Sequence, residues 1–196
     1  MFITFEGIDG AGKSTQASLL KKELEHLKYK VFLTREPGGS KTGEKIREIL
    51  VTDDLDPISE FLLFASDRRM HVHDVIKPKL QEGFIVISDR FIDSSVAYQG
   101  YGRGVSIDFI NDVHNFILEG VVPDLTFLID ITPATSFARL KDIDRIEKMG
   151  VEFLKIVREG YLTLAEKEKR FIVIDGEMEA SMILKLILEK TLSVLR

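Results

Sequence analysis

The chain has 196 residues, of which 44% are hydrophobic and 30% charged, and its 27 basic and 32 acidic side chains leave a formal net charge of −5. This length and apolar content predict one globular domain over residues 1–196 and exclude intrinsic disorder. The mild acidity argues against a general nucleic-acid binder, no apolar run is long enough for a membrane span, and there is no cysteine for disulfides or thiolate metal sites.

Two further features of the composition bear on where the protein works. The lack of cysteine and of an apolar leader after Met1 predicts a cytoplasmic protein. Asn and Gln together number only five, Trp is absent, and Glu and Lys are abundant. This balance is typical of proteins from thermophiles.

Short β-rich runs alternate with longer helical patterns along the chain. In chain order we expect a strand at Phe2–Phe5, a helix from Gly12 to Lys28, a strand at Val31–Thr34, a helix over Thr42–Leu50 and another from Pro57, which Pro78 should kink or restart. The series continues with a strand at Phe84–Ser88, a helix capped by Ser106, strands at Leu125–Ile129 and Phe171–Ile174, and a closing helix over Glu179–Leu195. Five continuous apolar strands between helices predict a three-layer α/β domain with a parallel sheet, whose ligands bind beyond the carboxyl ends of the strands.

A glycine-rich segment joins the first strand to the first helix. It reads Gly7-Ile8-Asp9-Gly10-Ala11-Gly12-Lys13-Ser14 and matches the P-loop pattern G-x-x-x-x-G-K-[ST]. Its backbone N–H groups and the helix N-terminus are suited to phosphate, with Lys13 bridging the β- and γ-phosphates and the Ser14 hydroxyl holding Mg²⁺. The alternative is a plain glycine-rich turn with an exposed lysine.

The class of P-loop protein is narrowed by motifs that the sequence lacks. No Asn is followed by Lys, so the N-K-x-D motif of GTPases is missing, and so is the L-S-G-G-Q signature of ABC proteins. A small kinase and a nucleotide-gated binding protein without catalysis remain.

The third predicted strand delivers an acid and an arginine to the carboxyl edge of the sheet. Asp89 is placed to orient Mg²⁺ through its water shell, and Arg90 could clamp an acceptor phosphate in bidentate fashion. The alternative is a strand-end salt bridge, which is disfavoured because adjacent residues of an extended chain point to opposite sides.

Five ordered motifs, from Met1 to about Gly176, resemble those of the thymidylate (dTMP) kinase family of P-loop nucleoside monophosphate kinases. They are the P-loop with its opening Phe5-Glu6-Gly7, Arg35-Glu36-Pro37-Gly38-Gly39, Leu63-Phe64-Ala65-Ser66-Asp67-Arg68, the segment from Ile87-Ser88-Asp89-Arg90 to Tyr98-Gln99, and Asp144-Arg145-Ile146-Glu147 in the lid. Pro123-Asp124-Leu125-Thr126 also precedes the fourth strand as in that family. The resemblance implies ATP as phosphoryl donor, dTMP as acceptor, Mg²⁺ as cofactor and a homodimer.

The resemblance also implies roles for individual residues. The ATP-binding residues would be Gly7, Ile8, Asp9, Gly10, Ala11, Gly12, Lys13, Ser14, Thr15 and Arg139, and the dTMP-binding residues would be Arg35, Glu36, Phe64, Arg68, Arg90, Ser94, Ser95, Tyr98 and Gln99. Asp9 would contact the 3′-hydroxyl of the acceptor sugar, and Tyr98 would pack against C2′ of deoxyribose. Lys13, Asp9, Asp89, Arg90 and Arg145 are the predicted catalytic residues.

Spacing supports a base site on the helix from Pro57. Phe64 and Arg68 are four residues apart and share one helix face, where a ring can stack on a base and an arginine can donate to a thymine carbonyl. The alternative places Phe64 in the core and Arg68 on the surface. Asp67 and Arg69 are expected to be ordinary surface charges, and His26, His71, His73 and His114 to be surface or packing residues.

A short lid is predicted over residues 137–149. The P-loop carries no arginine, so the cation that stabilises the transferring phosphoryl group should come from the lid, with Arg145 and Arg139 as candidates and Lys141 as a third. Two other functions stay open. A deoxynucleoside kinase is disfavoured by Arg35 and Arg90, which suit an acceptor phosphate, and a nucleotide-dependent switch is supported only by the reduced lid.

Overall fold

The computed structural model of the chain describes residues 1–139 and 149–195. Its strands are β1 (Phe2–Glu6), β2 (Val31–Arg35), β3 (Ile85–Asp89), β4 (Leu125–Asp130) and β5 (Phe171–Asp175). Its helices are α1 (Lys13–His26), α2 (Lys41–Thr52), α3 (Pro57–His71), α4 (Lys77–Gln81), α5 (Ile92–Ser95), α6 (Ile107–Ile117), α7 (Pro133–Arg139), α8 (Val151–Lys167) and α9 (Ala180–Leu195), with π-helical segments η1 (Val72–Ile76) and η2 (Val96–Gly102).

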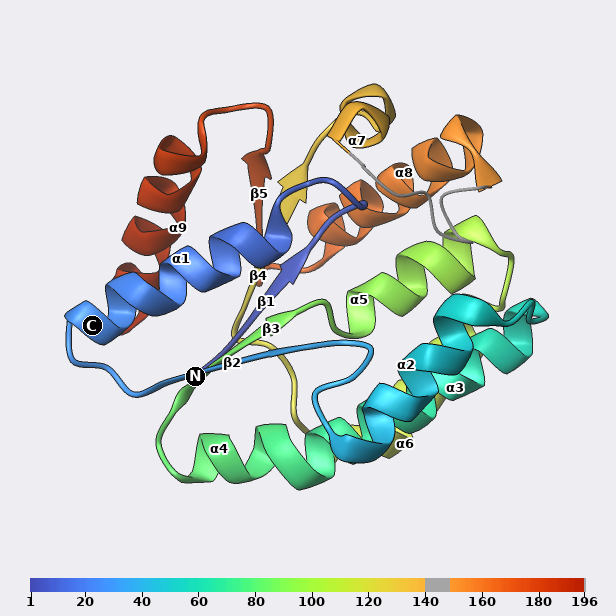
Figure 1. Ribbon diagram of the computed structural model, residues 1–196, viewed down its shortest axis with the longest axis horizontal. Helices are drawn as coiled ribbons and strands as arrows, with labels where there is room; N and C mark the ends of the chain where they lie inside the picture. The colour runs from blue at the N-terminus through green and yellow to red at the C-terminus, as the bar shows by residue number, and fades with distance from the viewer. Residues whose placement is uncertain (140–148, 196) are drawn as a thin grey trace.

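The five strands form one parallel sheet in the order β2-β3-β1-β4-β5 (Figure 1). Parallel register brings the carboxyl ends of the strands to one edge, and each strand ends in a charged residue: Glu6, Arg35, Asp89, Asp130 and Asp175. The structure thus confirms the predicted three-layer α/β fold and all five strands, each to within about one residue at its ends.

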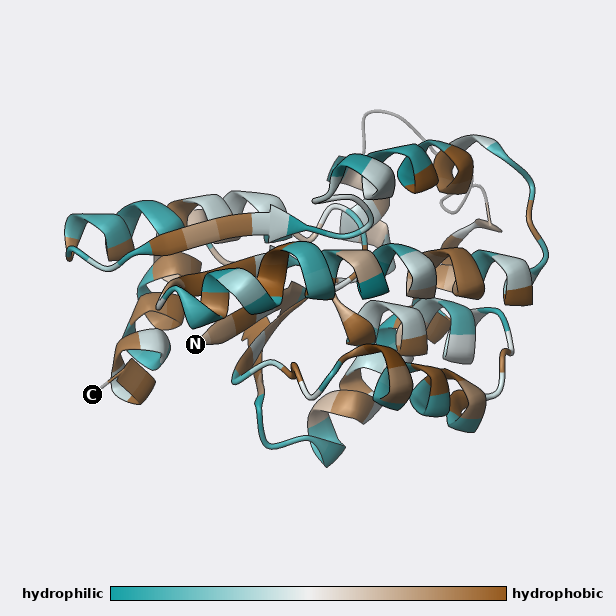
Figure 2. Cartoon of the chain, turned by 90° about the horizontal axis from the view of Figure 1, so that it is seen from below, coloured by the Kyte–Doolittle hydropathy of each residue, from teal (hydrophilic) through white to brown (hydrophobic). Residues whose placement is uncertain are grey.

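Alternating side chains of the strands serve the two faces of the sheet. Ile3 and Ile87 belong to a core cluster with residues of α1 and α9, whereas Phe2 and Val86 pack with Val72 and other residues of η1 on the opposite face. Helices α4 and α8 also contact the sheet. Figure 2 shows mainly hydrophobic strands between helices that carry both hydrophobic and hydrophilic residues. Both faces of the sheet are therefore buried, as continuous apolar strands require.

Helix starts follow the sequence signals. Ser106 Oγ accepts from the backbone N–H of Phe109, so it caps α6 as predicted, and Asp56 and Ser40 cap α3 and α2 in the same way. The predicted restart at Pro78 takes a specific form. Because Pro78 has no N–H to donate, the helix widens into η1 before continuing as α4 rather than breaking.

One long helix, α8, was not among the elements expected from the sequence. Its buried residues Phe153, Leu154, Val157 and Tyr161 recur at helical spacing. In the part of the chain that the structure describes, no helix is long and apolar enough to cross a membrane.

Candidate active site

The P-loop curls between β1 and α1 and borders a cavity of about 420 Å³. Gly7 has a φ of +137°, and a Cβ atom there would lie 2.4 Å from the carbonyl oxygen of Ile129, so only glycine fits this first turn. The cavity is lined by Asp9, Gly10, Gly12, Lys13, Ser14 and Thr15, and beyond the loop by Arg35, Glu36, Arg47, Asp89, Arg90 and Arg139. We call it the phosphate cavity.

Lys13 lies at the floor of the phosphate cavity with a side chain that is only 6% exposed. Its ammonium donates to the carbonyl of Ile8 at 2.9 Å and lies 3.8 Å from Asp9 Oδ1. Burial, followed by the charge of Arg90, lowers the pKa of Lys13. A partly desolvated cation is thus held where an anionic ligand would compensate it.

The predicted metal residues meet at the end of β3. The Ser14 hydroxyl donates to Oδ2 of Asp89, and Asp89 Oδ1 is buried without a hydrogen-bond partner among the residues that the structure describes. A hydroxyl and a carboxylate with a free oxygen are suitable donors for Mg²⁺, which keeps several waters and phosphate oxygens as its other ligands. The described residues contain no cluster of three or more His, Asp or Glu side chains that could hold a metal by themselves.

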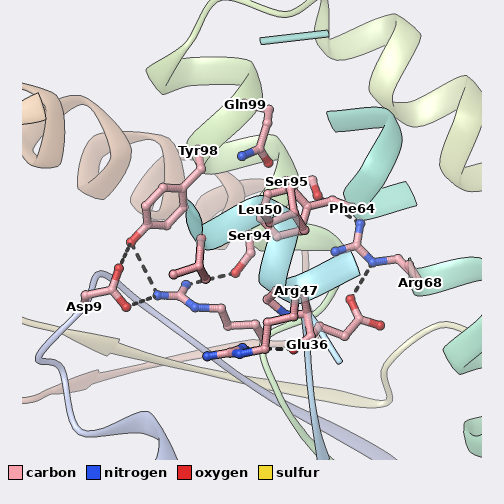
Figure 3. Close-up of a pocket in the computed structure, with 13 residues that line it drawn as sticks. Asp9, Glu36, Arg47, Leu50, Phe64, Arg68, Ser94, Ser95, Tyr98 and Gln99 are labelled. Carbon is pink, nitrogen blue, oxygen red and sulfur yellow. Dashed lines mark hydrogen bonds and ion pairs between the residues drawn. The ribbon is translucent and has the colours of Figure 1, made fainter. Parts of the chain in front are cut away.

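A second cavity, of about 140 Å³, opens between α2, α3 and the α5–η2 segment (Figure 3). We call it the acceptor cavity. It is lined by Asp9, Glu36, Pro37, Arg47, Leu50, Val51, Phe64, Arg68, Arg90, Ser94, Ser95, Tyr98 and Gln99. All the residues predicted to bind dTMP line it except Arg35, which lines the phosphate cavity instead.

Arg90 stands at the junction of the two cavities. Its backbone φ is +70°, a conformation that residues other than glycine rarely adopt. Its guanidinium donates to Asp9 Oδ1 at 2.6 Å, to Ser94 Oγ at 3.0 Å and to the Gly7 carbonyl at 3.1 Å. Burial alone would raise the pKa of Asp9, but the charges of Arg90 and Lys13 outweigh it and leave this pKa below its usual range. Asp9 is therefore a carboxylate, able to accept from a hydroxyl.

Arg68 is buried rather than on the surface. Its Nε donates to Glu36 Oε2 at 2.7 Å, and the two amino groups donate to Ser95 Oγ, to the Phe91 carbonyl and to His114 Nε2. His114 must accept here because a guanidinium cannot, and burial together with the charge of Arg68 lowers its pKa to about 2. These contacts fix Arg68 as part of the wall of the acceptor cavity.

Asp67 corrects the sequence prediction of an ordinary surface charge. Its side chain is fully buried, and Oδ2 accepts from the backbone N–H of Gly38 at 3.0 Å. Burial, followed by the charge of Glu36, raises the pKa of Asp67 to about 6. The prediction failed because α3 also packs against the loop that follows β2. Arg69 is 39% exposed, as expected.

The histidines behave as surface or packing residues, with one addition. His71 is buried, and its Nδ1 bonds to Glu36 Oε1 at 2.9 Å while Nε2 bonds to Thr34 Oγ1 at 2.7 Å. Together with Arg68 it holds Glu36 in a fixed position. His73, by contrast, is 60% exposed.

Glu6 is a residue of the site that sequence reasoning named only within a motif. It is fully buried and accepts from the Phe91 N–H at 2.8 Å, from Ser94 Oγ at 2.6 Å and from the Tyr161 hydroxyl at 3.1 Å. Burial, followed by the charge of Asp93, raises the pKa of Glu6 to about 7. The sequence signal that could have identified Glu6 as a site residue is a glutamate at the end of an apolar strand.

Arg47 was not predicted, although it lines both cavities. Its NH1 donates to the Pro37 carbonyl at 2.9 Å. Arg35, which was predicted, is 55% exposed and pairs with Glu44 at 3.1 Å. Both arginines reach the phosphate cavity from the β2–α2 side, but no short motif marks Arg47, which lies in the middle of α2.

Arg139 ends α7 and lies against the P-loop. Its guanidinium donates to the Gly176 carbonyl at 3.1 and 3.2 Å and to the Gly10 carbonyl at 3.4 Å. This places a cation on the P-loop side of the phosphate cavity. Lys141 and Arg145 of the predicted lid lie outside the described residues.

The two cavities share four wall residues: Asp9, Glu36, Arg47 and Arg90. The shared stretch contains two carboxylates and two guanidinium groups. A molecule in the acceptor cavity would therefore meet a molecule in the phosphate cavity at a charged boundary, which is the arrangement that in-line transfer between two bound ligands needs.

Comparison with known proteins leads to one family. A family described as "Thymidylate kinase" matches residues 5–187. A thymidylate kinase of Sulfurihydrogenibium sp. (strain YO3AOP1) is 49% identical over 193 residues, which cover 96% of this chain and 95% of that protein. One of Halothermothrix orenii is 45% identical over 185 residues, covering 90% and 89%. The crystal structure of thymidylate kinase from Ehrlichia chaffeensis superposes with a TM-score of 0.83 at 39% identity, covering 97% of both chains.

Proposed function

The chain belongs to the thymidylate kinase family, and from that premise we propose that it transfers the γ-phosphoryl group of ATP to dTMP across the boundary between its two cavities. It is thus a nucleoside monophosphate kinase whose products are ADP and dTDP. The observation that carries the proposal is the shared wall of Asp9, Glu36, Arg47 and Arg90, because it joins the P-loop to the acceptor cavity.

In the phosphate cavity, the backbone of residues 7–15 cradles the phosphates of ATP, and Lys13 reaches the transferring group. When the acceptor phosphate enters, Arg90 donates to it from the junction, and Arg35 and Arg47 add charge from the β2–α2 side. The carboxylate of Asp9 accepts from the 3′-hydroxyl of the acceptor sugar. Little covalent assistance is required, because positioning and charge neutralisation supply the rate enhancement.

In the acceptor cavity, Phe64 offers a ring face to the base, and Arg68 closes the pocket behind it. Ser94, Ser95 and Gln99 supply polar atoms, and Tyr98 packs against C2′ of the sugar. These assignments agree with the position of each side chain on the cavity wall.

Mg²⁺ is part of the proposal. Ser14 and Asp89 would hold it, directly or through water, since Asp89 Oδ1 is buried and without a partner among the described residues. When bound, the ion neutralises charge on the β- and γ-phosphates. Arg139 binds ATP from α7, and Arg145 supplies the transition-state cation from the lid at residues 137–149.

The remaining parts of the proposal concern the whole chain, as a single kinase domain over residues 1–196. A homodimer is supported by large apolar side chains left exposed on three neighbouring helices: Ile49 and Val51 of α2, Ile58 and Leu62 of α3, and Phe109 and Phe116 of α6. The cysteine-free composition supports a cytoplasmic location, and the low Asn and Gln content supports a thermophilic source.

The test is an ADP-release assay with ATP, Mg²⁺ and a panel of nucleosides and nucleoside monophosphates. dTMP should give the highest kcat/KM. Turnover of thymidine in preference to dTMP would instead indicate a deoxynucleoside kinase, and ATP binding without turnover of any acceptor would indicate a nucleotide-dependent switch.

A further inference from the structure

A buried carboxylate lies directly behind the acceptor cavity. Glu60 of α3 is fully buried and does not line the cavity itself. One of its oxygens accepts from Gln99 Nε2 at 2.9 Å, and the other accepts from Arg103 NH1 at 2.7 Å. Gln99 is only 2% exposed, yet it does line the cavity, and Figure 3 shows its side chain reaching in from η2.

The hydrogen bond to Glu60 removes the usual freedom of an amide. A glutamine side chain can turn its N–H or its C=O toward a ligand, but an ionised carboxylate only accepts. Arg103, whose side chain is 12% exposed, pairs with the other oxygen of Glu60 as its countercharge. Gln99 must therefore direct Nε2 to Glu60, and its carbonyl oxygen is the end that remains for a ligand.

We propose that Glu60 is a positioning residue that fixes the Gln99 amide with its oxygen toward the base, so that the cavity selects pyrimidines with a ring N3–H over those without. Thymine and uracil carry a hydrogen at N3, whereas N3 of cytosine is an acceptor. The inference rests on the proposed function only in taking the acceptor to be a pyrimidine nucleoside monophosphate.

The consequence is a difference between bases rather than a general gain in affinity. An N3–H facing Gln99 Oε1 is paired, while the N3 of cytosine would leave two buried acceptors facing each other. An unpaired buried acceptor reduces binding by roughly ten- to a hundredfold. The discrimination depends on Glu60, because without it the amide can turn and donate to cytosine.

The experiment uses Glu60→Gln, which keeps the shape but lets residue 60 donate as well as accept. The dissociation constants of dTMP, dCMP and dUMP are measured by calorimetry, and kcat/KM is measured for each nucleotide. We expect the preference for dTMP over dCMP to fall about tenfold or more, whereas the preference for dTMP over dUMP stays constant because both carry N3–H. A merely structural role would weaken all three nucleotides together.

Two further variants complete the design. Arg103→Lys keeps a cation beside Glu60 and should retain the preference for dTMP over dCMP. The exchange Glu60→Gln with Gln99→Glu again places a donor behind and an acceptor in front, so it should restore the preference even if the single variant folds poorly.

An unchanged dTMP to dCMP ratio in Glu60→Gln, or loss of the ratio in the exchanged pair, would overturn the inference. Failure of the unmodified protein to phosphorylate dTMP would instead overturn the proposed function, so the two failures are distinguishable.

Discussion

Lys13 contributes a single charge that the fold holds in the phosphate cavity. Lys13→Ala should reduce kcat more than about tenfold, a loss above ~1.4 kcal/mol, because the contact to the transferring phosphoryl group disappears. The variant should remain folded, since within residues 1–139 and 149–195 the ammonium makes one hydrogen bond, to the Ile8 carbonyl, and Asp9, its ion-pair partner, keeps its contact with Arg90.

Steady-state kinetics and thermal unfolding of the same variant test this. Lys22→Ala, which removes an exposed lysine from the same helix, is the control and should keep full activity. A folded Lys13→Ala protein with more than about a tenth of the original kcat would show that Lys13 is not at the transferring group.

Tyr98 combines a ring on the cavity wall with a hydroxyl that donates to Asp9 Oδ2 at 3.0 Å. The two parts can be separated. Tyr98→Ala should raise the relative use of ribothymidine monophosphate over dTMP roughly ten- to a hundredfold, because the ring leaves a 2′-hydroxyl neither room nor a partner. Tyr98→Phe keeps the ring and should retain the sugar preference. If both variants slow the two nucleotides equally, the sugar is selected elsewhere.

Glu6 predicts a pH dependence of stability. Burial and the charge of Asp93 raise its pKa from 4.5 to about 7, so the folded protein keeps a proton that the unfolded chain releases near pH 4.5. Protonated Glu6 makes its full contribution to the free energy of unfolding below pH 4.5, and this contribution is lost as the pH rises through 7. The contribution is at most roughly 3 kcal/mol.

Glu6→Gln should therefore become more stable relative to the original protein between pH 5 and pH 8. Urea unfolding at several pH values measures the free energy of unfolding of both proteins. Subtracting one from the other removes the contribution of Asp67, whose pKa is also raised. Glu48→Gln, an exposed change on α2, should show no such trend. A stability difference that is constant with pH would contradict the prediction.

At the level of elements, the start of α2 depends on close approach to α3. Gly43 is helical, and a Cβ atom there would meet Asp67 Oδ1 at 2.2 Å and the Gly38 carbonyl at 2.9 Å. Gly43→Ala should displace α2 and with it Arg47, so we expect a loss of about 1–3 kcal/mol of stability and a higher KM for dTMP. Lys45→Ala, an exposed change two residues further along α2, is the matched control. Unchanged unfolding and KM would mean that α2 adapts without moving the site.

The sequence predicts the five strands of this fold well because each is apolar over most of its length, and the turns after β1 and β2 carry glycine or proline. The P-loop, Asp89 and Arg90 were found for the same reason, since they belong to contiguous motifs at strand ends. Arg47 and Glu60 were not found. Each lies inside a helix, and its place near the site is set by how α2 and α3 pack, which no local pattern encodes.

Residues on the cavity wall and residues in the interior also differ in how well the sequence predicts their positions. The place of Phe64 on the wall of the acceptor cavity follows from its helical spacing to Arg68, and that of Tyr98 was implied by the family resemblance. Burial of Asp67 does not, because it depends on the loop after β2 folding back onto α3. The π-helical geometry of η2, which carries Tyr98 and Gln99, likewise has no signature in the local sequence.

At the scale of the whole molecule, the exposed apolar face of α2, α3 and α6 predicts self-association. Phe116 is 88% exposed, and Ile58 and Phe109 line one groove together. Helices α2 and α3 are in contact, as are α3 and α6, so the three present neighbouring surfaces. Monomeric proteins rarely leave a large continuous apolar patch in water, because burying it against a second copy is favourable.

Phe116→Glu should convert the proposed homodimer into a monomer, because the new charge would be buried without a partner in the contact between the two copies. The substitution should leave the fold intact, since an 88% exposed ring contributes little to the core of one chain. Light scattering coupled to size-exclusion chromatography measures the mass. Met182→Glu, which puts the same charge on a 57% exposed position of α9, should keep the mass of the original protein. A dimer that survives Phe116→Glu but dissociates with Met182→Glu would place the interface on α9, and a monomeric original protein would exclude the homodimer. The consequence for binding separates association from catalysis: Phe116 lines neither the acceptor cavity nor the phosphate cavity, so a folded Phe116→Glu monomer should still bind dTMP.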